Sequence, residues 1–315
     1  MDADRIARAF GLGARPRLSD GPVASGKQGV VWRLDTDDGR YAVKAPARPE
    51  SEDDVRAATA FHEAAYAAGV PTPRIHRSIE GAVFADVDGA RVRVYEWVDL
   101  LPPDLTLDPG QVGVAVAAVH RVPDPQPEQG PVAAWYAEPL GAGRWDDLVE
   151  RLRAARAPFA GELAALRDEL VALEEWVAPH ERVRTCHRDL WADNLLPTAA
   201  GGVCVIDWEN SGPADLVYEL GCVLFEFGRG DPARARALLD AYREAGGPAR
   251  VSRRRDFSML ICQLSHITEH AAEAWLAAAP GSLARDEAAG WVRELIDDPH
   301  TRRGLGIMLA AAGAR

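Results

Sequence analysis

The stretch TCHRDLWADNLLPTAAGGVCVIDWENSGPADL, residues 185–216, holds the most informative pattern in the chain. His187, Asp189 and Asn194 form HxDxxxxN, and Asp207 ends the apolar run VCVID. We expect Asp189 and Asn194 on a loop before a short hairpin, so that their side chains converge with Asp207. One carboxylate can then accept a hydroxyl proton, while an amide oxygen and a second carboxylate bind Mg²⁺. Phosphoryl transfer from a nucleotide requires this set of groups.

The rest of the chain predicts two lobes with a ligand cleft at their join. Residues 17–98 read as strands interrupted by one helix at about 53–68, for which Ser51 is the expected N-cap. GVVWRLDTDDGRYAVKAP, residues 29–46, alternates like two strands joined by an Asp38-Gly39 turn. After the proline-rich segment 99–110 the pattern turns helical, apart from a strand-like island at 183–207. We therefore predict an N-terminal nucleotide-binding lobe, 1–98, and a helical catalytic and substrate-binding lobe, 99–315.

GPVASGKQ, residues 21–28, comes within one residue of the phosphate-binding pattern GxxxxGK[ST]. Polar sequence precedes it, strands rather than a helix follow it, and Gln28 replaces the hydroxyl residue beside Lys27. These glycines therefore belong to a hairpin, and we do not interpret the stretch as a Walker loop. A glycine-rich hairpin can still cover phosphates in another fold.

Composition indicates an ordinary soluble protein. The 315 residues are 47% hydrophobic, and the net charge of −12 argues against nucleic acid or an anionic membrane as partner. A cationic small molecule suits such a field better. The four cysteines form no CxxC pair and are expected to be reduced. The first residues lack the apolar core of a signal peptide, so we expect a cytoplasmic location.

Several short motifs together resemble the aminoglycoside phosphotransferase family. They are HxDxxxxN followed by the strand ending in Asp207, DWE in place of DFG, GPADL behind it, AAVHRV upstream, and GVPTPR after the first helix. The resemblance covers most of the chain. It implies an α+β, protein-kinase-like bilobal fold, with a small β-rich N-terminal lobe and a larger helical C-terminal lobe.

The resemblance also implies a role for each matching position. Asp189 would be the catalytic base, and Asn194 and Asp207 would hold Mg²⁺ against the phosphates of ATP, or of GTP. Lys44, in YAVKAP, would bind the α- and β-phosphates. The remaining nucleotide contacts would come from the hairpin tip and from the backbone of YEWV, with Tyr95 behind the base: Ser25, Gly26, Lys27, Gln28, Glu96 and Val98.

Two positions depart from the family pattern. Arg188 stands where relatives usually have glycine. Alanine, near Ala57 or Ala58, stands where a helix glutamate would fix Lys44, although a shifted helix could supply Glu52, Asp54 or Glu63 instead. An unpaired Lys44 would favour a catalytically weak, nucleotide-binding regulatory protein.

The acceptor is expected to be a small, cationic molecule such as an aminoglycoside or another antibiotic. Carboxylates on the C-terminal helices and beside the catalytic residues could bind its amines; the candidates are Asp193, Glu209, Glu269 and Glu273. Choline, sugars and amino-acid derivatives are alternative acceptors. His266, Glu269 and His270 also spell HxxEH, a zinc-peptidase pattern, although a polar helix face is the simpler interpretation.

Overall fold

The computed structural model describes residues 1–26, 29–47, 51–126 and 129–313. Two compact units are formed, one by residues 1–104, 121–126 and 192–211, the other by residues 105–120, 127–191 and 212–315. Residues 192–211 join the first unit partly because the Val205 N–H donates to the Pro71 C=O at 2.7 Å. This grouping differs from a single boundary at residue 98, so the lobe boundary stays a prediction.

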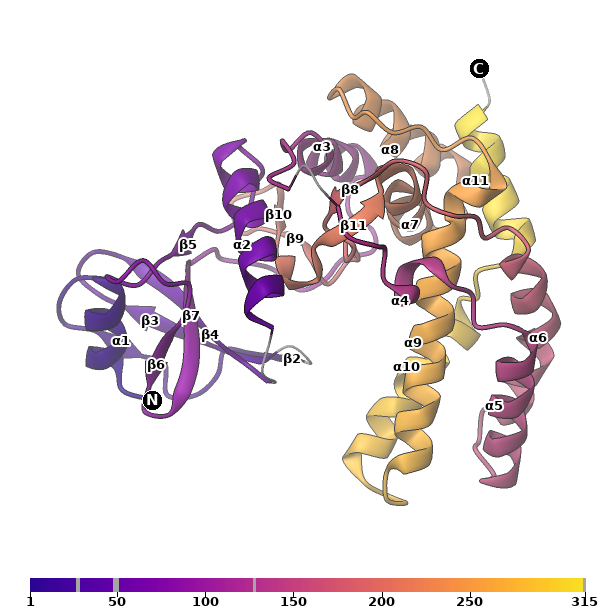
Figure 1. Cartoon of the computed structure of the whole chain (residues 1–315), viewed down its shortest axis with the longest axis horizontal. Coiled ribbons are helices and arrows are strands. Elements are labelled where there is room, and N and C mark those ends of the chain that lie inside the picture. Colours follow the sequence, from indigo (N-terminus) through magenta and orange to yellow (C-terminus); the bar gives the residue numbers. More distant parts are fainter. Residues whose placement is uncertain (27–28, 48–50, 127–128, 314–315) are drawn as a thin grey trace. The chain divides into compact units, whose positions relative to one another are not determined.

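An antiparallel sheet with strand order β1-β3-β4-β7-β5 forms the centre of the first unit, with β2 beside β3 and β6 beside β7 (Figure 1). The strands are β1 (Arg17–Leu18), β2 (Ala24–Gly26), β3 (Gly29–Asp35), β4 (Arg40–Pro46), β5 (Ile75–His76), β6 (Ala85–Val87) and β7 (Ala90–Glu96). The Thr36 N–H donates to the Gly39 C=O at 2.9 Å and closes the predicted turn between β3 and β4. The alternating pattern of residues 29–46 therefore predicted this hairpin correctly.

Two helices complete the first unit's frame. Helix α1 (Ala3–Phe10) buries Ile6 and Phe10 in a cluster with Leu34, Val43 and Val94 of the sheet. Helix α2 (Glu52–Ala67) begins after Ser51, whose hydroxyl accepts the Asp54 N–H at 3.5 Å. The hairpin of β9 (Leu195–Pro197) and β10 (Val203–Val205) is followed by the short 3-10 helix η1 (Trp208–Asn210).

The second unit is mainly helical. Its elements are α3 (Pro109–His120), α4 (Ala134–Ala137), α5 (Ala142–Ala154), α6 (Ala160–Glu174), β8 (Val183–Cys186), β11 (Gly212–Asp215), α7 (Leu216–Gly228), α8 (Pro232–Glu244), η2 (Arg254–Phe257), α9 (Ser258–Ala277), α10 (Leu283–Asp297) and α11 (Arg302–Gly313). Trp145, Leu163, Trp275 and Val292 share one core cluster contributed by α5, α6, α9 and α10. Within the described part of the chain, no helix combines the length and apolar content needed to cross a membrane.

Close packing of α3 on α8 requires a glycine. A Cβ on Gly113 would lie 2.3 Å from the Leu238 C=O oxygen, so no larger residue fits unless the helices separate. This contact brings His120, the last residue of α3, against Tyr242 of α8, with their rings edge to face at 5.5 Å between centroids.

Candidate active site

Lys44 is paired with two carboxylates inside the first unit. It lies on β4, is 6% exposed, and its Nζ is 2.6 Å from Asp207 Oδ1 and 2.8 Å from Glu209 Oε1. Among the described residues these are its ion-pair partners. Burial lowers the pKa of Lys44, but the charges of Glu209 and Asp207 outweigh it and the pKa is raised above its ordinary value. The ammonium is therefore fixed in its charged form.

Glu209 is the centre of this group. Arg93 stands opposite Lys44 in the β4–β7 register, and its Nη2 lies 3.1 Å from the same oxygen, Glu209 Oε1. The Tyr95 hydroxyl donates to that oxygen at 3.4 Å. Burial raises the pKa of Glu209, but Lys44 and Arg93 more than compensate and lower it to about 2. Glu209 thus contacts two buried cations, and Asp207 gives Lys44 a second negative partner.

Helix α2 contacts the DWE motif through aromatic rings and not through the expected glutamate. Glu63 pairs with Arg77 at 2.7 Å, so it is not the substitute partner of Lys44. The helix instead presents aromatic rings to Trp208 of the DWE motif: the His62 ring stacks on it at 5.1 Å and Phe61 meets it edge to face at 5.4 Å. The indole N–H of Trp208 donates to Thr72 Oγ1 at 2.9 Å. Packing rather than an ion pair therefore connects α2 to the motif.

Asp207 and Asn194 are brought together by the β9–β10 hairpin. The Ile206 N–H donates to the Asn194 C=O at 3.0 Å, which places Asn194 beside the end of the strand that carries Asp207. Asp207 itself has φ 60°, a left-handed conformation that a non-glycine residue adopts at some energetic cost. A carboxylate and an amide oxygen suit Mg²⁺, which uses one or two protein ligands plus substrate phosphates. Elsewhere in the described chain, no group of three His, Cys, Asp or Glu could hold a metal alone.

Asp189 lies in the second unit, on the loop after β8. β8 pairs with β11, so Cys186 at the end of β8 stands opposite Gly212 at the start of β11. Arg188, just before Asp189, has φ 64° and is held by side chains from two helices. Its N–H donates to Glu219 Oε1, and its C=O accepts from Gln263 Nε2 at 2.9 Å.

The Arg188 side chain, present where relatives usually have glycine, packs between Tyr136 and Gly212. Its guanidinium lies over the Tyr136 ring at 4.3 Å. Gly212 makes room for it, because a Cβ there would lie 2.6 Å from Arg188 Nη2. A cation–π contact thus accompanies the left-handed backbone that glycine would adopt more easily.

The predicted nucleotide contacts at the hairpin tip are partly described. Ser25 and Gly26 lie on exposed β2, whereas Lys27 and Gln28 lie outside the described residues. Gly29 has φ 143°, and a Cβ there would lie 2.2 Å from the Ala45 C=O oxygen, so β3 and β4 approach closely only because this residue is glycine.

Glu96 and Val98 each give one backbone group to a hydrogen bond with a neighbouring part of the chain. The Glu96 N–H donates to the Arg74 C=O at 2.8 Å, and the Val98 C=O accepts the Leu100 N–H at 2.9 Å. The groups we assign to a nucleotide base are the Glu96 C=O and the Val98 N–H. This assignment remains a prediction.

The structure shows where the four acids predicted to bind an acceptor lie. Asp193 is exposed, and Glu209 belongs to the Lys44 group described above. On α9, Glu269 forms an ion pair with Arg144, and Glu273 forms one with Arg151 at 2.5 Å. An acceptor amine would have to compete with these guanidinium groups for either carboxylate.

The HxxEH pattern on α9 is occupied by structural contacts. His266 Nε2 lies 3.0 Å from the Glu138 C=O oxygen, and Glu269 is committed to Arg144. The zinc-peptidase interpretation therefore gains no support.

Sequence reasoning missed Arg93, Glu219 and Gln263. Arg93 alternates with buried valines in VRVYE, a polar residue inside an apolar strand, and that signal could have identified it. Glu219 is the single acid in the apolar run LVYELGCVL and could have been found in the same way. Gln263 carries no comparable signal.

Comparison with known proteins agrees with this geometry. Residues 21–254 match the model of the phosphotransferase enzyme family. This chain therefore belongs to that family.

Individual relatives are more distant. A homoserine kinase of Pseudomonas aeruginosa is 38% identical over 116 residues, which is 34% of this chain and only 33% of that protein. The structure of a spectinomycin phosphotransferase with ADP and spectinomycin has a TM-score of 0.69 and 13% identity, covering 98% of this chain and 97% of that one. An aminoglycoside phosphotransferase from Alicyclobacillus acidocaldarius has a TM-score of 0.62 and 18% identity, covering 97% and 93%. These structures establish the protein-kinase-like fold.

Proposed function

We propose that this protein is a small-molecule kinase that transfers the γ-phosphate of ATP or GTP to a hydroxyl of a small, cationic acceptor. The observation that supports this most is the contact of Lys44 Nζ with Asp207 Oδ1 at 2.6 Å. The contact places the strand lysine beside the acid of the DWE motif, and in kinases these two groups serve the phosphates and Mg²⁺ respectively.

The transfer breaks the bond between the γ-phosphorus and the bridging oxygen of the nucleotide and forms a bond from that phosphorus to the acceptor oxygen. Asp189 orients the acceptor hydroxyl and takes its proton. Lys44 neutralises charge on the α- and β-phosphates. Asp207 and Asn194 are the residues that would hold Mg²⁺, which neutralises the β- and γ-phosphate oxygens when bound.

We assign Glu209 as the residue that positions Lys44. When Asp207 turns towards a metal, Lys44 loses one partner but keeps the other carboxylate, which lies 2.8 Å from its Nζ. Glu209 would then do what the helix glutamate does in relatives. The alternative of a regulatory, catalytically weak protein depended on an unpaired Lys44, and this contact removes its main support.

The acceptor class is proposed from charge and family. The net charge of −12 favours cations, and the relatives described above are named for spectinomycin, aminoglycosides and homoserine, all of which carry both amines and hydroxyls. An amino alcohol is therefore the acceptor we expect, with an antibiotic as one possibility and an amino-acid derivative or choline as another.

The test is nucleotide consumption with Mg²⁺ and ATP or GTP over aminoglycosides, spectinomycin, homoserine and choline. Asp189→Ala should lower kcat by about 10²-fold or more while nucleotide affinity changes little. Full activity in Asp189→Ala would refute the assigned base. Nucleotide binding without acceptor-dependent consumption would favour the regulatory alternative.

A further inference from the structure

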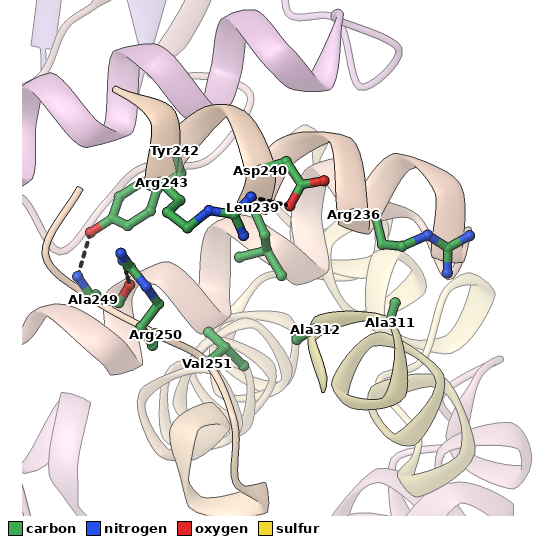
Figure 2. Close-up of a pocket in the computed structure, with 10 residues that line it drawn as sticks. All are labelled: Arg236, Leu239, Asp240, Tyr242, Arg243, Ala249, Arg250, Val251, Ala311 and Ala312. Carbon is green, nitrogen blue, oxygen red and sulfur yellow. Dashed lines mark hydrogen bonds and ion pairs between the residues drawn. The ribbon is translucent and has the colours of Figure 1, made fainter. Parts of the chain in front are cut away.

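A pocket of about 520 Å³ lies within the second unit (Figure 2). It is formed by α8, the chain just after it, and the end of α11. Its volume lies in the range of small-molecule sites. Aliphatic side chains line it together with three arginines and one acid: Leu239, Val251, Ala311 and Ala312, with Arg236, Arg243, Arg250 and Asp240.

The pocket is positively charged, although the chain as a whole carries a net negative charge. Three arginines against Asp240 leave an excess of two positive charges in a protein of net charge −12. Arg243 pairs with Asp240 at 3.0 Å, and Arg250 Nη1 donates to the Gly247 and Ala249 C=O groups, both at 2.6 Å. The exposed Arg236 has no hydrogen-bond or ion-pair partner among the described residues. In Figure 2 the Arg236 and Arg250 side chains lie at opposite ends of the pocket.

One wall of the pocket is connected to the loop that carries Asp189. The Tyr242 hydroxyl accepts the Ala249 N–H at 3.0 Å and lies 2.8 Å from His120 Nδ1. His120 Nε2 lies 2.9 Å from Glu219 Oε2, and the other oxygen of Glu219 accepts the Arg188 N–H.

The hydrogen bonds that join Ala249, Tyr242, His120 and Glu219 all donate in the same direction. The pKa of Glu219 is lowered, so its carboxylate accepts and His120 Nε2 donates to it. With its hydrogen on Nε2, the His120 ring accepts the Tyr242 hydroxyl proton at Nδ1. Tyr242, His120 and Glu219 are at most 1% exposed, so water does not replace these bonds. A shift of Ala249 therefore alters the bonds that hold Arg188.

We propose that this pocket binds a small organic phosphate monoester and transmits its occupancy to the Arg188 amide. The excess of two positive charges matches a phosphate dianion, and the aliphatic lining accepts an apolar body. With its phosphate at Arg236 and Arg243 of α8 and its apolar body against Val251, the bound monoester bridges α8 and the segment after it. That bridge restrains Ala249 and, through Tyr242, His120 and Glu219, slows opening of the loop at Arg188.

Binding is tested by calorimetric titration of the whole protein with phenyl phosphate, with benzyl alcohol as the uncharged probe of similar shape. We expect phenyl phosphate to bind and benzyl alcohol not to bind. Arg236→Gln combined with Arg243→Gln should weaken phenyl phosphate by about tenfold or more, since each charged hydrogen bond contributes that much. Lys44→Met should leave the affinity unchanged, which separates this pocket from the proposed nucleotide site.

Absence of phenyl phosphate binding at millimolar concentration would overturn the proposal, and so would full affinity in the double arginine variant. The single variant Arg236→Gln removes an exposed side chain that has no partner in the described part of the chain. It should also weaken phenyl phosphate, and it gives a second test if the double variant is unstable.

Transmission is tested by hydrogen exchange of the segment 183–195 in the unaltered protein, with and without phenyl phosphate. We expect slower exchange at the Arg188 amide with the probe, and loss of that response in Tyr242→Phe. Binding with unchanged exchange in the unaltered protein would refute the transmission. Neither measurement uses nucleotide or acceptor, so a wrong kinase assignment would not produce these failures.

Discussion

The ammonium of Lys44 on β4 lies 2.8 Å from the carboxylate of Glu209, two residues beyond the acid that ends the VCVID run. The lysine partner thus comes from the segment after Asp207 rather than from α2. Arg93 and Tyr95 of the neighbouring strand contact the same oxygen of Glu209. The position of the lysine therefore depends on the β4–β7 register as well as on the DWE motif.

Replacing Glu209 by Gln is expected to lower kcat/KM for nucleotide by about 10- to 100-fold. The neutral amide removes the negative charge that Lys44 and Arg93 both contact, which costs about 1.5–3 kcal/mol for each charged hydrogen bond, while Asp207 still pairs with Lys44. Steady-state kinetics measures it. Glu63→Gln, an acid of α2 paired with Arg77, is the matched control and should have little effect. A larger loss of kcat/KM in Glu63→Gln than in Glu209→Gln would indicate that an acid of α2 positions Lys44.

Glu209 should also contribute to acid stability. Its folded pKa of about 2 is below the ordinary value, so its stabilisation is present above that ordinary value and disappears as pH falls towards 2. The difference in unfolding free energy between the unaltered protein and Glu209→Gln should therefore be constant near neutrality and shrink below about pH 4. Chemical denaturation at several pH values checks this, and a difference independent of pH would contradict it.

Asp207→Asn is expected to weaken Mg²⁺-dependent nucleotide binding by about tenfold or more, because an amide is a poorer ligand for a hard cation than a carboxylate. Titration of nucleotide with and without Mg²⁺ measures it. Asp193→Asn, an exposed acid next to Asn194, is the control. Equal weakening in both variants would argue against a specific metal role for Asp207.

Gln263→Ala is expected to lower kcat by about tenfold while leaving the KM for nucleotide unchanged. It removes the donor to the part-buried Arg188 C=O, which costs about 1 kcal/mol or more and loosens the residue before Asp189. Gln111→Ala, an exposed glutamine at the start of α3, is the control. A raised KM with unchanged kcat would show that Gln263 does not position Asp189.

His300 should make stability depend on pH. Burial lowers its pKa to about 4, and neither ring nitrogen has a hydrogen-bond partner among the described residues. The unfolded chain therefore takes up a proton near pH 6.5 and the folded chain only near 4. The contribution of neutral His300 to the unfolding free energy is fully present above pH 6.5, and it falls by about 3 kcal/mol as pH drops to 4. His300→Phe should lack this loss in denaturant titrations, and an identical pH profile would contradict the expectation.

The fold could be predicted from the sequence where the pattern is local or the motif specific. The alternation around Asp38-Gly39 gave the β3–β4 hairpin, and Ser51 gave the start of α2. The partner of Lys44 could not be predicted, because it depends on which residue of β7 faces β4 and on the left-handed turn at Asp207. The bonds that hold Arg188 likewise come from helices 31 and 75 residues further along the chain.

The central claim is tested most directly by acceptor-dependent nucleotide consumption of the purified protein and of Asp189→Ala, with Mg²⁺ and the amino-alcohol panel. Turnover with at least one acceptor that falls by about 10²-fold in Asp189→Ala is the predicted result. Turnover that is equal in both proteins would contradict the account.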